Sequence, residues 1–218
     1  MKIRPARPDD VEGMLRIKQE LRLDPAGGDA PGGGFLLGAT REQYEFLVAN
    51  AQVLALADDG GALGGFAIAL PDPVLRATDV WTRRRSIAWG DGNWDALEGA
   101  RVAYFDQLAV RPGRRHRTYA PALALAALER LAEKGHQHLF ATVVREPVMN
   151  LTSPPLLHAI GAARVGTIDE EYPGVGRVLS DVYHLALHPG TAADLASGSA
   201  LGRRIARTLA AAAEPSIP

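Results

Sequence analysis

The segment from Arg101 to Lys134 constrains the fold of this chain more than any other. Residues 101–110 have the apolar character of a strand, and residues 120–134 place alanine and leucine along one stripe of a helix. The turn between them is rich in arginine and opens directly into the helix. Backbone N–H groups and the positive end of the helix dipole converge on such a turn, so a phosphate group is expected to bind there.

Strands and helices alternate around this segment. Residues 139–144 are almost wholly apolar, as in a strand buried on both faces, so 101–144 is expected to be a strand–helix–strand crossover with a parallel strand pair. Apolar runs on either side of Asp58-Asp59-Gly60-Gly61 predict a hairpin with strands at 52–57 and 62–70. Further strands are predicted at 2–7, 164–168 and 178–187, and further helices at 11–21, 40–49 and 153–160.

A single domain is expected to cover residues 1–188. Residues 72–99 interrupt its pattern with three tryptophans and a run of three arginines, and we interpret them as an insertion that forms a helix and a loop. Residues 189–218 are expected to form a C-terminal tail, helical over 191–213.

Composition limits the classes of function. The 24 basic and 25 acidic residues give a net charge of -1, which provides no overall field to attract nucleic acid or a membrane surface. The absence of cysteine excludes a cysteine nucleophile and thiolate metal ligands, and His136-x-His138 lacks a further ligand to complete a metal site. No apolar run has the length of a signal sequence core or a membrane span, so a cytoplasmic location is expected.

Two short motifs resemble a known family. The first is Leu108-Ala109-Val110-Arg111-Pro112 followed by Arg115-x-x-Thr118-x-Ala120, and the second is Asn150-x-x-Ser153 followed by Gly161-Ala162. Together with the order of elements between residues 2 and 188, these motifs resemble the GCN5-related N-acetyltransferase (GNAT) superfamily. The resemblance implies an α/β fold with a mixed, largely antiparallel sheet of six to seven strands, a central parallel pair and flanking helices.

The resemblance also implies a reaction and a co-substrate. GNAT enzymes transfer an acetyl group from acetyl-coenzyme A to an amine without a metal, and the acceptor expected here is an amine of a small molecule or peptide. The insertion at 72–99 would cover the acceptor pocket. The pyrophosphate of coenzyme A is expected on the backbone amides of the arginine-rich turn, and the pantetheine arm along the end of the preceding strand. Carried over by position, the cofactor-binding residues are Leu108, Val110, Arg115, His116, Arg117, Thr118, Tyr119, Ala120, Asn150 and Ser153.

Asp106 is the candidate general base. Alternate residues of a strand share a face, so Tyr104, Asp106, Leu108 and Val110 are expected to point the same way. Family members commonly carry a carboxylate on this face, and Asp106 is the acidic residue there. It would take a proton from the amine directly or through water, with Tyr104 orienting the amine or the water. The alternative is that Asp106 only hydrogen-bonds the neighbouring backbone.

The general acid is left open. Leu157 stands where many relatives have a tyrosine, Tyr183 and His184 are alternative donors, and a thiolate can also leave without a dedicated acid. Thr118 replaces a glycine of the family pattern and Pro121 removes an amide donor. These departures favour an alternative function, a catalytically weak GNAT-fold protein that binds a ligand or a partner. A structural protein that forms a homodimer through its tail helix is a third hypothesis.

Overall fold

The computed structural model describes residues 2–26, 29–30, 32–57, 60–90, 97, 99–113, 118–198 and 203. None of the described helices is long and apolar enough to cross a membrane. The strands are β1 (Lys2–Pro5), β2 (Gln52–Ala57), β3 (Leu63–Leu70), β4 (Ile87–Trp89), β5 (Val102–Val110), β6 (His138–Glu146), β7 (Ala163–Tyr172) and β8 (Gly176–Ala186). The α-helices are α1 (Val11–Glu20), α2 (Arg41–Asn50), α3 (Asp72–Arg76), α4 (Asp79–Arg83), α5 (Tyr119–Glu133), α6 (Ser153–Ala159) and α7 (Thr191–Gly198).

One mixed sheet joins all eight of these strands in the order β1-β2-β3-β5-β6-β8-β7-β4. The pair β5 and β6 in the middle is parallel, and the other neighbours are antiparallel. The prediction of six to seven strands is therefore wrong, because the sheet has one further strand, β4, which comes from the insertion. Three residues are too few to show a strand period in the sequence, so this edge strand could not be distinguished from a loop.

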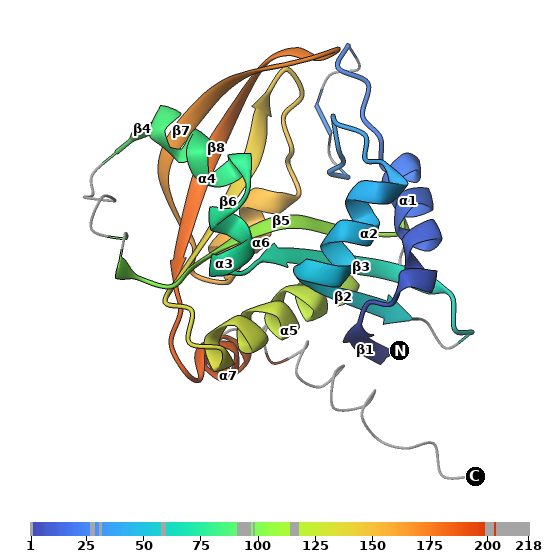
Figure 1. Ribbon diagram of the computed structural model, residues 1–218, viewed down its shortest axis with the longest axis vertical. Helices are drawn as coiled ribbons and strands as arrows, with labels where there is room; N and C mark the ends of the chain where they lie inside the picture. The colour runs from blue at the N-terminus through green and yellow to red at the C-terminus, as the bar shows by residue number, and fades with distance from the viewer. Residues whose placement is uncertain are drawn as a thin grey trace.

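The sheet divides into two wings at its centre. Strands β5 and β6 pair only where Val102–Tyr104 meets His138–Phe140. Beyond these residues β5 continues along β3 while β6 continues along β8, and the two wings diverge (Figure 1). The backbone of β5 after Tyr104 is thus paired along one edge by β3 and has no strand along its other edge among the described residues.

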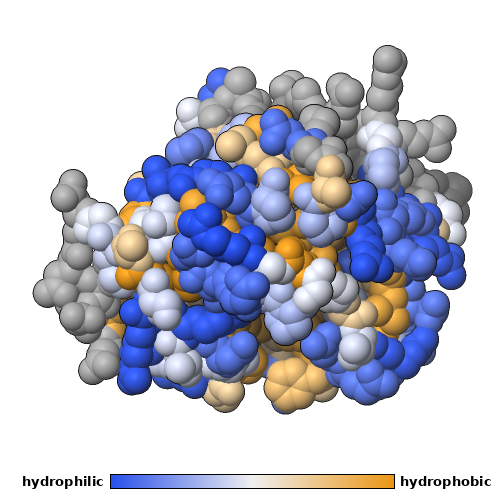
Figure 2. Space-filling view, turned by 90° about the horizontal axis from the view of Figure 1, so that it is seen from above, coloured by the Kyte–Doolittle hydropathy of each residue, from blue (hydrophilic) through white to orange (hydrophobic). Residues whose placement is uncertain are grey.

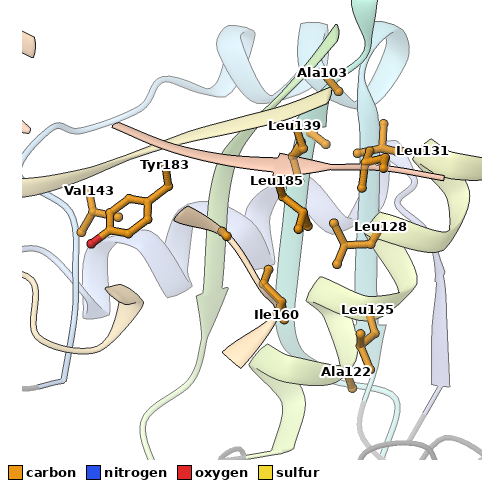
Figure 3. Packing of buried hydrophobic residues seen from close by; sticks show 13 residues of the cluster. Ala103, Ala122, Leu125, Leu128, Leu131, Leu139, Val143, Ile160, Tyr183 and Leu185 are labelled. Carbon is orange, nitrogen blue, oxygen red and sulfur yellow. The ribbon is translucent and has the colours of Figure 1, made fainter. Parts of the chain in front are cut away.

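Helix α5 packs against one side of the sheet. Leu128 and Leu131 of α5 lie close to Leu185 of β8 and Leu139 of β6, and Leu125 lies beside Ala122 in the same cluster (Figure 3). Each fully buried leucine contributes roughly 1.5–3 kcal/mol relative to an exposed one, so this stripe fixes the crossover between the two central strands. Helix α7 also lies against α5, and from there the tail residues 199–202 and 204–218 fall outside the described residues.

The insertion covers the opposite side of the sheet together with α1 and α2. Leu75 of α3 and Trp81 of α4 pack in the same hydrophobic cluster as Met14 of α1 and Tyr44 of α2. Strand β4 then joins the outer edge of β7 as an antiparallel strand. Seen from above, hydrophilic residues cover most of the surface, and hydrophobic residues show in the recesses between them (Figure 2).

We predict that Leu128→Ala lowers the free energy of unfolding by about 2–5 kcal/mol, because it leaves a cavity in the contact between α5 and the sheet. Leu128 is fully buried, whereas Phe46 on α2 is 54% exposed and serves as the control. Chemical denaturation of Leu128→Ala and Phe46→Ala measures both effects. An equal loss in the two variants would contradict the packing described for α5.

Candidate active site

Asp106 lies at a β-bulge in β5. In the pairing of β3 with β5, Ile68 lies opposite Gln107 and Ala69 lies opposite Phe105, so Asp106 has no partner residue on β3. A bulge sets two residues against one and re-aims the side chains that follow it. It occurs just beyond the point where β5 and β6 separate.

The bulge changes which residues of β5 share a face. Tyr104 packs in the cluster formed with α1, α2 and the insertion, whereas Leu108 and Val110 pack beside Leu123 of α5. The prediction that Leu108 and Val110 point the same way as Tyr104 is therefore wrong. The extra residue shifts the alternation by one position, which brings Ala109 onto the face of Tyr104.

A chain of hydrogen bonds holds the Asp106 carboxylate from the helix side. The Gln107 side-chain amide donates to Asp106 Oδ2 at 2.9 Å, and its own Oε1 accepts from the Tyr44 hydroxyl at 2.8 Å. Asp106 is half-buried, and burial raises the pKa of its carboxyl, while the Gln107 hydrogen bond and the charges of Lys18 and Arg83 act in the opposite direction. A raised pKa makes the ionised carboxylate a stronger base.

Lys18 is the functional candidate that the sequence did not single out. It is only 9% exposed, and its ammonium lies 4.8 Å from the centroid of the Phe35 ring and 3.5 Å from Gln107 Oε1. Burial lowers the pKa of Lys18, and the charge of Asp106 opposes that shift. A lysine within the apolar stripe of residues 11–21 was the available signal, since lysine is rarely buried without a partner.

Tyr104 connects the two wings at the point where they separate. Its hydroxyl lies 2.6 Å from Thr142 Oγ1 of β6. Burial, reinforced by the charge of Asp106, raises the pKa of the Tyr104 hydroxyl above its usual range. The hydroxyl therefore stays protonated at neutral pH and retains a hydrogen to donate.

A pocket lies between the insertion and the sheet, and Tyr104 lines it. Its volume is about 850 Å³, which includes open solvent at its mouth. Trp81 and Trp89 of the insertion and Phe140 of β6 supply aromatic walls. At its polar side Arg83 donates to Glu170 Oε1 at 2.8 Å. The insertion thus encloses apolar space beside the strand that carries Asp106.

The sequence and the structure were compared with known proteins, and only the structure has matches. No protein-family model matches the sequence, and no curated protein matches it either. The structure is similar to the ribosomal-protein-S18-alanine N-acetyltransferase of Escherichia coli, with 14% identity and a TM-score of 0.57 over 86% of this chain and 94% of that chain. It is also similar to the ribosomal-protein-alanine N-acetyltransferase of Brucella melitensis, with 15% identity and a TM-score of 0.57 over 86% of this chain and all of that one. A third similar structure is a GNAT superfamily phosphinothricin acetyltransferase of Sinorhizobium meliloti in complex with AcCoA, with 16% identity and a TM-score of 0.55 over 88% and 90% of the two chains.

The chain has the GNAT fold. Strand β5, the start of α5 and the start of α6 hold the predicted cofactor residues that the structure describes. Leu108 and Val110 present their backbones along β5, with β3 on one edge. Arg115, His116 and Arg117 lie outside the described residues.

The start of α5 is the described part of the arginine-rich turn. Thr118 precedes the helix, its side chain makes no capping hydrogen bond, and Tyr119 and Ala120 form the first residues of α5. A Cβ atom added to Gly64 would lie 2.9 Å from the Tyr119 ring, so a glycine is needed for this ring to rest on β3. Pro121 is accommodated in the first turn, where its missing N–H has no helical partner.

The second motif, Asn150-x-x-Ser153, has a local structural role. Asn150 Oδ1 accepts hydrogen bonds at 3.0 Å from the backbone N–H groups of Thr152 and Ser153, at the start of α6. Asn150 therefore supports the N-terminus of the helix through its side chain. Ser153 is the first residue of α6.

The candidate acids lie in different surroundings. Leu157 packs against the core, and Tyr183 is 4% exposed beside Val143, on the side of the sheet that α5 covers (Figure 3). His184 lies on the pocket side, where its Nε2 is 3.0 Å from His138 Nδ1. Burial lowers the pKa of His184 to about 4, so at neutral pH it has no proton to give as an imidazolium.

The predicted absence of a metal site concerns His136 and His138. His136 is buried, its Nε2 accepts from the Asp72 backbone N–H at 3.2 Å, and its Nδ1 lies 3.0 Å from the Leu131 carbonyl oxygen. These contacts fix the start of the insertion to the end of α5. Within the described ranges, no three histidine, aspartate or glutamate side chains gather as metal ligands would.

We predict that Asp106→Asn becomes more stable relative to the parent protein as pH rises. The raised pKa means that the folded state holds the Asp106 proton more tightly than the unfolded state does. Ionisation therefore opposes folding above the unfolded pKa of about 3.9, and asparagine does not ionise. Free energies of unfolding from pH 5 to pH 8 measure the difference. Glu129→Gln, which changes an exposed carboxylate on α5, is the matched control, and equal pH dependence in both variants would contradict burial of Asp106.

Proposed function

We propose that this protein is an acetyl-coenzyme A-dependent N-acyltransferase that moves an acetyl group to an amine of a small molecule or peptide, with Asp106 as its general base. The observation that carries the proposal is the position of Asp106. It is a half-buried carboxylate with a raised pKa, and it lies on a bulge beside the opening of the sheet, two residues after Tyr104, which lines the pocket. Similar GNAT folds belong to N-acetyltransferases, which supports this class of reaction.

The unpaired edge of β5 supports the proposed binding of coenzyme A. After Tyr104 this edge has no neighbouring strand among the described residues, so a row of main-chain N–H and C=O groups faces the opening. Such groups require partners, and the amides of a pantetheine arm match them at Leu108 and Val110. The N-terminus of α5 and the arginine-rich turn then supply backbone amides and charge for the pyrophosphate.

In the proposed reaction Asp106 accepts a proton from the acceptor ammonium, directly or through one water molecule. The freed nitrogen lone pair forms a bond to the thioester carbon, the nitrogen then loses its second proton to solvent, and the carbon–sulfur bond breaks as the thiolate leaves. Acetyl-coenzyme A supplies the activated acetyl group. Tyr104, protonated and anchored by Thr142, orients the amine or the water. The leaving thiolate takes its proton from solvent, since Leu157 cannot supply one.

A second candidate function is a catalytically weak protein that binds a ligand on the same fold. The observation that favours it is the environment of the candidate acids: Leu157 packs in the core, and His184 is neutral at physiological pH. Thr118 and Pro121 at the start of α5 add to this argument. In this case coenzyme A binds without turnover.

We predict that Asp106→Asn lowers kcat/KM for the accepted amine by roughly 10²–10⁴-fold, the usual contribution of general base catalysis. The parent activity rises with pH as Asp106 ionises, at a pH above the usual carboxyl range because its pKa is raised. The variant lacks this rise. Thiol release measured across pH with a panel of amines tests both points, with Glu129→Gln as control. Full turnover of Asp106→Asn at every pH would overturn the assignment.

We predict that Gly64→Ala weakens coenzyme A binding several-fold. Its new Cβ displaces the Tyr119 ring and with it the first turn of α5, where the pyrophosphate is proposed to bind. Gly38→Ala is the control, because a Cβ there has no atom within 4 Å and no strained backbone angle. Calorimetric titration with acetyl-coenzyme A measures both. If acetyl-coenzyme A at millimolar concentration did not bind the parent protein, the proposed enzyme activity would be refuted. Binding without thiol release would favour the catalytically weak ligand-binding protein.

A further inference from the structure

The pocket under the insertion has apolar walls on several sides. Trp89 of β4 and Phe140 of β6 meet edge to face, with ring centroids 6.0 Å apart. Ile87, Ile168 and Val182 line the space around these rings. Walls of this kind favour a ligand that brings an aromatic or aliphatic body out of water.

The positive charges around the pocket already have partners. The Arg83 guanidinium donates to Glu170 at 2.8 Å, and its Nε, which makes no hydrogen bond within the described residues, lies at ion-pair distance from Asp79 Oδ2, 3.7 Å away. Arg84 stacks on Trp81, with its guanidinium carbon 3.9 Å from the ring centroid, and donates to the Trp81 carbonyl oxygen. A ligand carboxylate would therefore compete with Glu170 and Asp79 for Arg83. Burying a ligand carboxylate that gained no such partner would be unfavourable.

The pocket and the proposed base are connected along β5. Tyr104 lines the pocket and lies two residues before Asp106 on the same strand. The charge of Asp106 acts on Tyr104 and Arg83, which both line the pocket, although Asp106 itself does not line it. Asp106 lies at one end of this arrangement, and the apolar walls under β4 lie at the other. A molecule that matches both ends has a cationic amine joined to a hydrophobic body.

We propose that the acceptor is a hydrophobic primary amine without a carboxylate, of the aryl-alkylamine class, with its amine at Asp106 and its ring in the pocket under the insertion. This inference rests on the proposed acetyl transfer and names the substrate class for it. The aromatic walls favour a ring over a polar chain, and Arg83, which lines the pocket, is already paired with Glu170 and Asp79 and is therefore less available to a ligand carboxylate. The insertion is the element that confers this specificity.

Matched amines test the substrate class. 2-Phenylethylamine is compared with phenylalanine, which adds a carboxylate, and with ethylamine, which lacks the ring. We expect kcat/KM for 2-phenylethylamine to exceed both by roughly ten- to a hundredfold, because ethylamine has no ring to bury and phenylalanine would have to bury a carboxylate. Equal or faster acetylation of phenylalanine would overturn this inference and leave the proposed acetyl transfer intact. The inference would also be overturned if the enzyme used octanoyl-coenzyme A as well as acetyl-coenzyme A and the octanoyl donor competed with 2-phenylethylamine. The acyl chain, and not the ring of the amine, would then occupy the pocket.

Two variants test the location of the ring. Ile87→Trp fills the pocket and Trp89→Ala removes one wall, and each is expected to raise KM for 2-phenylethylamine about tenfold while calorimetric binding of acetyl-coenzyme A is unchanged. Phe46→Ala, which changes an exposed residue of α2 that does not line the pocket, is expected to leave KM unchanged. Unchanged KM in both pocket variants, with folding verified by circular dichroism, would overturn the inference.

Calorimetry with 2-phenylethylamine alone separates the two proposals. If no amine of the panel releases thiol, the proposed acetyl transfer fails, and the titration still reports on the pocket. Binding of 2-phenylethylamine that Ile87→Trp weakens, and that phenylalanine does not match, would support the ligand class assigned to the pocket. Binding that is equal for the two ligands would overturn it.

Discussion

The separation of β5 from β6 is the constraint on which the rest of the structure depends. A parallel pair that ends after Tyr104 leaves main-chain groups of β5 without a strand partner, which is costly in a buried sheet. The sheet tolerates this because each central strand keeps an antiparallel neighbour, β3 for β5 and β8 for β6. The α5 leucines hold the wings together where the strands still touch. The packing of α5 against the paired part of β5 and β6 thus maintains the opening between the two strands.

The bulge turns this opening into a site with particular electrostatics. It presents Asp106 to the side covered by α1 and α2. There the Gln107 side-chain oxygen accepts a hydrogen bond from the Tyr44 hydroxyl and lies 3.5 Å from the Lys18 ammonium. A carboxylate and an ammonium are both withdrawn from water here, and their mutual attraction offsets part of that cost. The two helices therefore do more than cover the sheet, because Lys18 of α1 and the hydrogen bond of Tyr44 of α2 to Gln107 act on the surroundings of the carboxylate at its centre.

Much of this arrangement could be predicted from the sequence, and the exceptions have physical reasons. The helix at Tyr119–Glu133, the hairpin at 52–70 and the parallel crossover follow from local periodicity and turn residues. The bulge at Asp106 could not be predicted, because no glycine or turn residue marks it and the strand pattern continues through it. Lys18 reaches Gln107 only through the tertiary fold, 89 residues along the chain. Site geometry that arises from such distant contacts is invisible to periodicity.

Strand β4 attaches the roof of the pocket through its backbone. Main-chain pairing with β7 does not depend on the side chains of β4, of which Ile87 and Trp89 line the pocket and Ala88 is exposed. Gly166 allows the close approach, since a Cβ there would lie 2.8 Å from the Ala88 carbonyl oxygen. The attachment of β4 to the sheet and its contribution to the pocket wall are therefore separate features of a three-residue strand. Substitutions at Ile87 and Trp89 can change the pocket wall while the main-chain pairing with β7 is kept. In this way one fold can acquire different pocket specificities.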